Sequence, residues 1–154
     1  MRVAREARER IFGVPEKDSA TELAGSVCGR LLLRGLLSQP QMDAAKAFAA
    51  AYAAYHRAID APRPPKAVEI GAASGRGSGM DVTPEQAQRA KDNWRHACNA
   101  LREANCEPTN RGCTLYASCD YLVLRDENQP HLIGDLRVAL NVLARNYGLV
   151  ARAA

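Results

Sequence analysis

Apolar residues recur at three- and four-residue intervals along most of the chain, which is the spacing of one face of an α-helix. Three stretches show the pattern most clearly. Their apolar positions are Ala45, Phe48, Tyr52, Tyr55 and Ile59; Ala87, Ala90, Trp94, Ala97 and Leu101; and Leu132, Leu136, Leu140, Leu143 and Tyr147. Each stretch predicts an amphipathic helix that buries one face against other helices.

Residues at the ends of these stretches mark where the helices start and stop. Ser38 is a cap with Pro40 in the first turn, where proline is well tolerated. Thr83 is followed by a proline and then by Gln86 at the capping-box position. Gly148 suits the residue after the last turn of the final helix.

Two further helices are predicted in the first quarter of the chain. Residues 1–18 form a short amphipathic arm with apolar residues at four-residue spacing. Residues 19–36 form a longer helix that Asp18 or Ser19 can cap, with Leu23, Val27 and Leu31 on its apolar face. We expect this helix and the one after Ser38 to form an antiparallel hairpin.

Residues 111–125 fit two kinds of structure. Cys113, Leu115 and Ala117 begin an alternation typical of a strand, whereas Leu115, Cys119 and Leu122 suit a helix. We favour the helix, because no other segment offers a strand partner.

These patterns predict an all-α fold in four parts. Residues 1–18 are the amino-terminal arm and residues 19–60 the helical hairpin. Residues 61–82 are a linker, because they are too rich in proline and glycine for regular structure. Residues 83–154 are a three-helix carboxy-terminal unit. Whether the two halves pack together stays open.

Composition narrows the class of protein. At 154 residues, with 47% hydrophobic and 25% charged residues, the chain resembles an average globular domain. No stretch is apolar for the roughly 18 residues that a membrane span requires. Four arginines lie within residues 1–10 with no apolar run behind them, so we expect no secretory signal and a cytoplasmic protein.

The net charge of the chain is compatible with nucleic-acid binding but does not by itself indicate it. The net charge is +4, and no block of like charges occurs. Arginines outnumber lysines by 17 to 4, which suits phosphate and guanine recognition but also follows from a GC-rich coding sequence.

The sequence offers no recognisable enzyme or metal site. The phosphate-binding loop, the serine elbow and the zinc-binding helix motif are all absent, and we expect neither an enzyme nor a cofactor. No two of the five cysteines have the spacing of a zinc site. His96 and Cys98 cannot bind one ion together from a continuous helix, because their side chains point about 200° apart. We expect free thiols, and we expect the three histidines to be surface or boundary residues.

Two places are candidates for DNA binding. The final helix carries Arg137, Asn141 and Arg145 at strict four-residue spacing, and these residue types pair with guanine and adenine in the major groove. An ordinary solvated helix face is the alternative. The amino-terminal arm also carries basic residues that can lie along a DNA backbone. These are Arg2, Arg5 and Arg8, followed by Arg10.

Three stretches also resemble small uncharacterised proteins encoded by bacterial prophages. They are residues 5–13, the helices around residues 29–35, and the ending at residues 136–149. The resemblance spans most of the chain and implies a helical accessory protein in phage biology. It transfers no functional residue.

The sequence therefore predicts a small phage-type accessory protein that binds DNA or regulates transcription through a helix-turn-helix-like ending. The alternative is a helical adaptor or inhibitor that binds a host or phage protein and no nucleic acid. The partner and the oligomeric state are not encoded in any recognisable pattern.

Overall fold

The computed structural model describes residues 10–11, 21–60 and 82–150. Within these ranges the chain forms helices and turns and contains no strand, which confirms the predicted all-α class. None of the described helices is both long enough and apolar enough to cross a bilayer.

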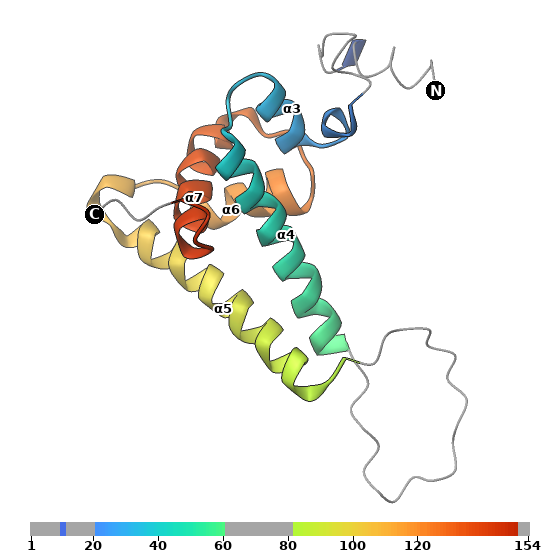
Figure 1. The fold of residues 1–154 in the computed structure, drawn as a ribbon. Helices are drawn as coiled ribbons and strands as arrows, with labels where there is room; N and C mark the ends of the chain where they lie inside the picture. Colours follow the sequence, from blue (N-terminus) through green and yellow to red (C-terminus); the bar gives the residue numbers. More distant parts are fainter. Residues whose placement is uncertain (1–9, 12–20, 61–81, 151–154) are drawn as a thin grey trace, which may run out of the picture.

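Two long helices form the frame of the molecule. Helix α4 (Gln39–Asp60) and helix α5 (Pro84–Cys106) approach each other at the ends that hold Asp60 and Pro84 and diverge toward their other ends (Figure 1). Helix α7 (Ile133–Asn146) lies between the diverging ends and contacts both. Helices α4, α5 and α7 therefore form the centre of one packed unit.

Trp94 holds α4 and α5 together where they converge. The centroid of its ring lies 5.0 Å from that of Phe48, 5.3 Å from Tyr52 and 5.9 Å from Tyr55. These three aromatic residues lie on the predicted apolar face of α4, so the face does meet a partner helix. The partner is α5, together with α7, rather than mainly the preceding helix.

Helix α7 supplies several of the most deeply buried residues. Leu136, Leu140 and Leu143 are 0% exposed, as are two alanines on the same face. They join a single hydrophobic core to which α3, α4, α5 and α6 also contribute. The segments before and after residues 61–81 therefore share one core.

Both long helices begin at the predicted caps. The Ser38 hydroxyl accepts from the Gln41 backbone amide, and the Gln41 side chain accepts from the Ser38 amide at 2.8 Å. Thr83 and Gln86 form the same reciprocal pair at the start of α5. The final helix ends as predicted at Gly148, whose φ of +68° places it in the left-handed region.

The helix predicted over residues 19–36 is wrong in its extent. A short 3₁₀ helix, η1 (Glu22–Gly25), is followed by a break, and α3 (Val27–Leu33) begins only after it. The Ser26 hydroxyl accepts from the Gly29 amide and caps α3, so the cap is Ser26 rather than a residue before Thr21. The predicted arm at residues 1–18 lies outside the described residues except at its short helical piece, Arg10 and Ile11.

The break folds η1 back onto the first turn of α3. A Cβ atom added at Gly29 would lie 1.8 Å from the Leu23 carbonyl oxygen, so the two backbones meet at a point that only glycine permits. The backbone that approaches Gly29 is therefore the preceding turn of the same segment. Across the molecule, the Val27 amide donates to the Asp126 carboxylate at 2.6 Å.

The ambiguous segment is helical. Helix α6 (Leu115–Cys119) runs directly into a π-helical turn, η3 (Asp120–Leu124). The buried Ser118 hydroxyl donates to the Leu115 carbonyl at 2.7 Å, a local bond that tends to bend helices. Arg125 closes the turn with an ion pair of 2.9 Å to Asp120.

Short 3₁₀ helices complete the chain trace at the ends of the longer elements. Helix η2 (Pro108–Asn110) follows α5, and the Asn110 side chain donates to the Ala104 carbonyl at 2.7 Å. Helix η4 (Pro130–Leu132) leads into α7. Both provide tight turns that bring α6 and α7 back against α5.

We predict that Gly29→Ala destabilises the protein by about 1–3 kcal/mol, because the new methyl group must displace backbone. Gly134→Ala is the matched control, since both glycines are helical and nothing lies within 4 Å of the added Cβ at Gly134. The control should be neutral or stabilising by about 0.5–1 kcal/mol. Urea unfolding of both variants tests this, and equal effects would contradict the packing of η1 on α3.

Candidate functional site

Two open cavities adjoin each other along one side of α5 and share Cys98. The larger has a volume of about 470 Å³ and the smaller about 400 Å³. The smaller is lined by Tyr55, Ile59, Lys91, Trp94, Arg95 and Cys98. We refer to the two cavities together as the α5 groove.

The larger cavity lies between α5 and α6. The side chains that give it apolar character are Cys98, Leu101, Cys106, Cys113, Leu115, Tyr116 and Ala117. Polar groups come from four further residues at its margin, which are Asn99, Arg102, Asn105 and Thr114. An apolar surface with a few polar groups is typical of binding sites.

The wall formed by α6 is held in place by two hydrogen bonds that anchor the start of the helix. The Leu115 amide donates to the Asn105 side chain at 3.3 Å, and the Thr114 amide donates to the Asp135 carboxylate at 2.8 Å. These bonds tie α6 to α5 and to α7. The groove is therefore built on packed helices rather than on a free loop.

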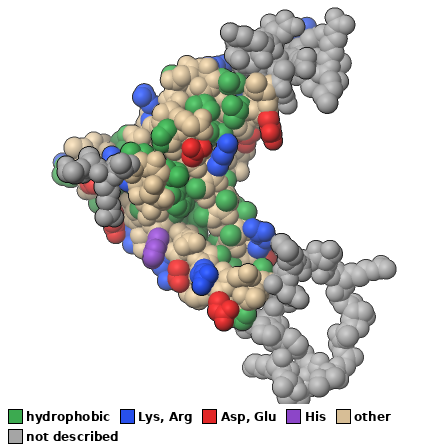
Figure 2. All heavy atoms as spheres, viewed as in Figure 1, with side chains coloured by type: hydrophobic (Ala, Val, Ile, Leu, Met, Phe, Trp, Pro, Cys, Tyr) green, Lys and Arg blue, Asp and Glu red, His purple; other side chains and the backbone are tan. Residues whose placement is uncertain are grey.

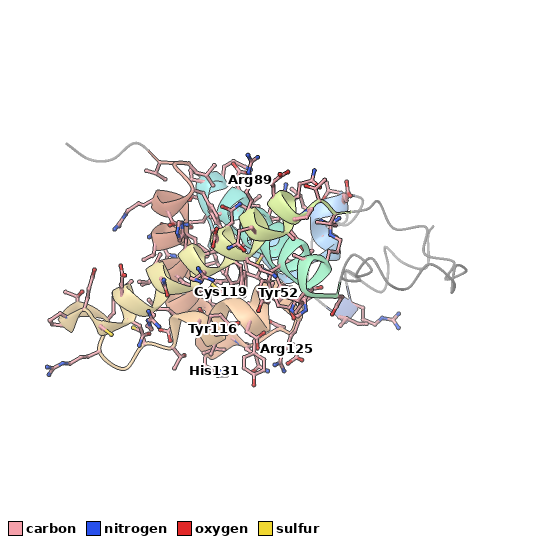
Figure 3. All side chains as sticks on the ribbon, turned by 90° about the horizontal axis from the view of Figure 1, so that it is seen from below. Tyr52, Arg89, Tyr116, Cys119, Arg125 and His131 are labelled. Carbon is pink, nitrogen blue, oxygen red and sulfur yellow. The ribbon has the colours of Figure 1, made fainter. Side chains whose placement is uncertain are left out.

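Helix α4 contributes Tyr55 and Ile59 to the smaller cavity, and further aromatic side chains of α4 pack behind this lining. The Tyr52 ring lies 4.3 Å from the His56 ring and 5.3 Å from Trp94, while Tyr55 stacks on Trp94. Viewed from below, Tyr52 and Cys119 lie near the middle of the molecule, Tyr116 lies below them in the view, and Arg89 lies at the upper edge (Figure 3).

Two apolar side chains of the groove lining remain open to solvent. Ile59 is 46% exposed and Tyr116 is 47% exposed. On the face seen in Figure 2, hydrophobic side chains likewise gather over the middle of the molecule, while charged side chains lie mostly toward the margins. Exposed apolar residues that line a cavity often mark an interaction site.

Neutral groups surround the junction of the two cavities. Burial raises the pKa of the Cys98 thiol. Burial raises the pKa of Tyr116, and the negative charge of Asp120 adds to the effect. Both side chains are therefore neutral at physiological pH, and the charge of the groove lining comes from Lys91, Arg95 and Arg102.

The predicted DNA-binding residues of α7 are exposed, but one of them, Asn141, bonds to a side chain of α4. Arg137, Asn141 and Arg145 are exposed, and no ion pair joins either arginine to a described carboxylate. The Asn141 side-chain oxygen, however, accepts from the Gln41 amide at 3.0 Å, and Gln41 also donates to the Arg137 carbonyl. The bond to Gln41 uses one of the two acceptor positions of the Asn141 oxygen and holds that oxygen toward α4, which restricts how the side chain can turn toward an adenine.

The other predicted DNA-binding residues, Arg2, Arg5 and Arg8, lie outside the described residues. Arg10 is described and exposed. The predicted glycine-rich linker also falls outside the described ranges for residues 61–81.

The described residues form no candidate metal site. No group of three or more histidine, cysteine or acidic residues gathers among them closely enough to hold an ion. All five cysteines are free thiols. His96 and His131 are exposed, whereas His56 is half-buried against Tyr52.

Comparisons with protein families, with curated proteins and with solved structures found no match to this chain. The candidate site is therefore argued from the geometry of its own residues.

Sequence reasoning did not find the α5 groove. Its lining comes from three helices that are distant in the sequence, and Cys98 and Tyr116 belong to no recognisable motif. The sequence did contain one indication that this surface is apolar. Ile59 continues the apolar face of α4 one turn past Tyr55, beyond the point where the core requires it.

Thiol reactivity should follow burial. Burial raises the pKa of both Cys28 and Cys119 to about 12, so at pH 8 only about one in ten thousand of either thiol is the reactive thiolate. Cys106 is exposed. We predict that a disulfide reagent modifies Cys106 first and reaches Cys28 and Cys119 only in denaturant.

The order is measured by the absorbance of the released thiolate, and Cys106→Ser should remove the fast phase. A single rate for all five thiols of the native protein would contradict the packing around Cys28 and Cys119.

Proposed function

We propose that this chain is a helical interaction module that binds a partner protein through the α5 groove. The observation that carries the proposal is the pair of cavities that meet at Cys98, with exposed Ile59 and Tyr116 in their lining. The accessory role in phage biology that the sequence resemblance implies is compatible with such a module.

The dimensions of the groove support a protein ligand. It follows α5 from Lys91 to Cys106, which corresponds to about 22 Å of helix. An apolar groove several turns long suits the apolar face of an amphipathic helix, which inserts side chains at positions i, i+3, i+4 and i+7. The adjoining half-buried rings supply large apolar contact areas, as aromatic residues do at many interfaces.

Photocrosslinking from the groove tests the proposal. A photoreactive phenylalanine analogue replaces Tyr116, whose exposed ring tolerates substitution, and the protein is irradiated inside its native host. We expect a crosslinked protein of defined mass, identified by mass spectrometry. Ile59→Glu in the same chain should reduce its yield by about tenfold or more, because it places a charge in the apolar lining.

The control places the same analogue at His96, which is exposed on α5 and does not line the groove. Unfolding curves establish that Ile59→Glu leaves the fold intact. Equal crosslinking from positions 116 and 96, or a yield that Ile59→Glu leaves unchanged, would overturn the proposed function.

DNA binding by α7 remains the second candidate, favoured by the exposure of Arg137 and Arg145 without a described ionic partner. Under this candidate the two guanidinium groups contact phosphates or guanine, while Asn141 stays bonded to Gln41. The arginines are eight residues apart, about 12 Å along the helix axis, so they can reach separate phosphates.

This candidate predicts that the wild-type chain binds duplex DNA at low salt. Replacing Arg137 and Arg145 by alanine should lower the slope of log affinity against log salt by about two, because each arginine that contacts phosphate releases one counterion. Fluorescence anisotropy measures the slope. The matched control is Arg57→Ala with Arg89→Ala, which removes two exposed arginines elsewhere and should leave the slope unchanged. Identical slopes for the two double variants would retire the DNA candidate.

A further inference from the structure

Basic residues follow the α5 groove along a single stripe. Lys91, Arg95 and Arg102 line its two cavities, at spacings of four and seven residues that keep them on one side of α5. Lys91 and Arg102 are about 16 Å apart along the axis of α5. None of the described aspartates and glutamates lines either cavity.

The acidic residues of α5 lie elsewhere on the helix. At 100° per residue, Glu85, Asp92 and Glu103 are about 100–120° around the helix from Lys91. The acidic residues therefore lie on a different side of α5 from the cations of the groove, and Arg89, at about 160° from Lys91, lies with them. The positive sign of the groove is therefore a local arrangement and not a consequence of net charge.

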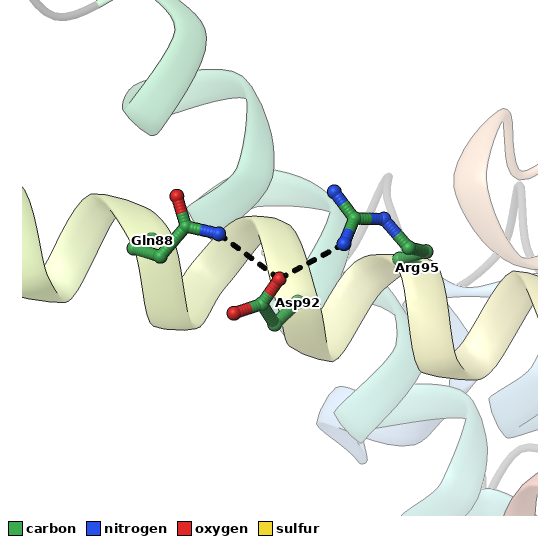
Figure 4. Close-up of polar contacts among 3 residues, drawn as sticks. All are labelled: Gln88, Asp92 and Arg95. Atoms are coloured by element: carbon green, nitrogen blue, oxygen red, sulfur yellow. Dashed lines mark hydrogen bonds and ion pairs between the residues drawn. The ribbon is translucent and has the colours of Figure 1, made fainter.

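The three cations differ in how far they are neutralised. Asp92 pairs with Arg95 at 3.2 Å and also accepts from Gln88 at 3.0 Å (Figure 4). Arg102 donates to the neutral side chain of Asn99, and no described carboxylate pairs with Lys91. Lys91 and Arg102 thus leave most of the positive charge of the groove uncompensated, one in each cavity.

We propose that the partner segment is an acidic amphipathic helix whose apolar face enters the α5 groove while its carboxylates meet Lys91 and Arg102. This inference rests on the proposed function and specifies the chemistry of the partner. About three turns of helix span the distance between the two cations, so carboxylates roughly eleven residues apart match them. Complementary charge of this kind fixes orientation and speeds association.

A single-stranded nucleic acid is the other ligand that cations and rings could attract. Such ligands stack their bases on open aromatic faces. Trp94 has Phe48, Tyr52 and Tyr55 packed around it, so little of its ring is free for a base. The apolar thiols, leucines and alanine of the larger cavity suit aliphatic and aromatic side chains better than phosphates.

Synthetic peptides test the inference directly. Three peptides of about 20 residues share one apolar face of leucine and phenylalanine, and their polar faces carry glutamate, lysine or glutamine. None contains tryptophan, so the fluorescence of Trp94, which is the single tryptophan of the chain and lines the groove, reports binding. We expect the glutamate peptide to bind about tenfold more tightly than the lysine peptide at low salt, and the difference to shrink at about 0.5 M salt.

Two double variants locate the charge effect. Lys91→Glu with Arg102→Glu should reverse the preference, so that the lysine peptide binds more tightly. Arg57→Glu with Arg89→Glu changes the net charge equally at exposed positions outside the groove lining and should leave the preference unchanged. Unfolding curves confirm that both variants fold.

Each remaining outcome overturns the inference in a recognisable way. Equal binding of the three peptides, or a preference that the Lys91 and Arg102 variant retains, removes the acidic partner. The proposed function survives that result if photocrosslinking from position 116 still captures a protein. If no peptide binds and a 15-residue oligothymidine binds instead, the groove is a nucleic-acid site and both proposals fail.

Discussion

The position of α7 between the diverging ends of α4 and α5 is the constraint on which the rest of the structure depends. Its leucines are completely buried, so α4 and α5 cannot close on each other along their full length. Trp94 and the aromatic residues of α4 close the other end. Helix α6 packs against α5 and α7 on the diverging side, and the larger cavity of the α5 groove is the space that this packing leaves open.

A groove framed in this way is rigid for a physical reason. Its walls belong to helices whose opposite faces lie in the hydrophobic core, and moving either wall would expose residues such as Phe48 or Leu115. Hydrogen bonds from Leu115 and Thr114 fix the start of α6. A partner that binds here therefore spends little free energy on ordering the site, which favours affinity.

The parts of the fold that depend on local pattern were predictable. The apolar faces of α4, α5 and α7 follow helical spacing, and Ser38 and Thr83 cap the expected helices. The break before α3 was not predictable from spacing, because Leu23, Val27 and Leu31 stay in phase across it. The decisive residues are Ser26, which competes as a cap, and Gly29, which admits the Leu23 carbonyl.

The candidate site was harder to predict for a different reason. Periodicity correctly placed Arg137, Asn141 and Arg145 on an exposed face, yet it contained no sign that Gln41, a hundred residues from Asn141, would occupy that side chain. The groove could not be predicted for the same reason. Ile59, Cys98 and Tyr116 line it together only because of the way α4, α5 and α6 pack.

Charge along α5 shows how such a tertiary site still leaves a trace in the sequence. Helix α5 does not need segregated charge for its own stability, because neighbouring acidic and basic residues at i, i+3 or i+4 stabilise a helix wherever they lie on its surface. Asp92 and Arg95 form such a pair. Lys91 and Arg102 form none with a described carboxylate and line the groove instead, so pairing within the helix does not account for their placement.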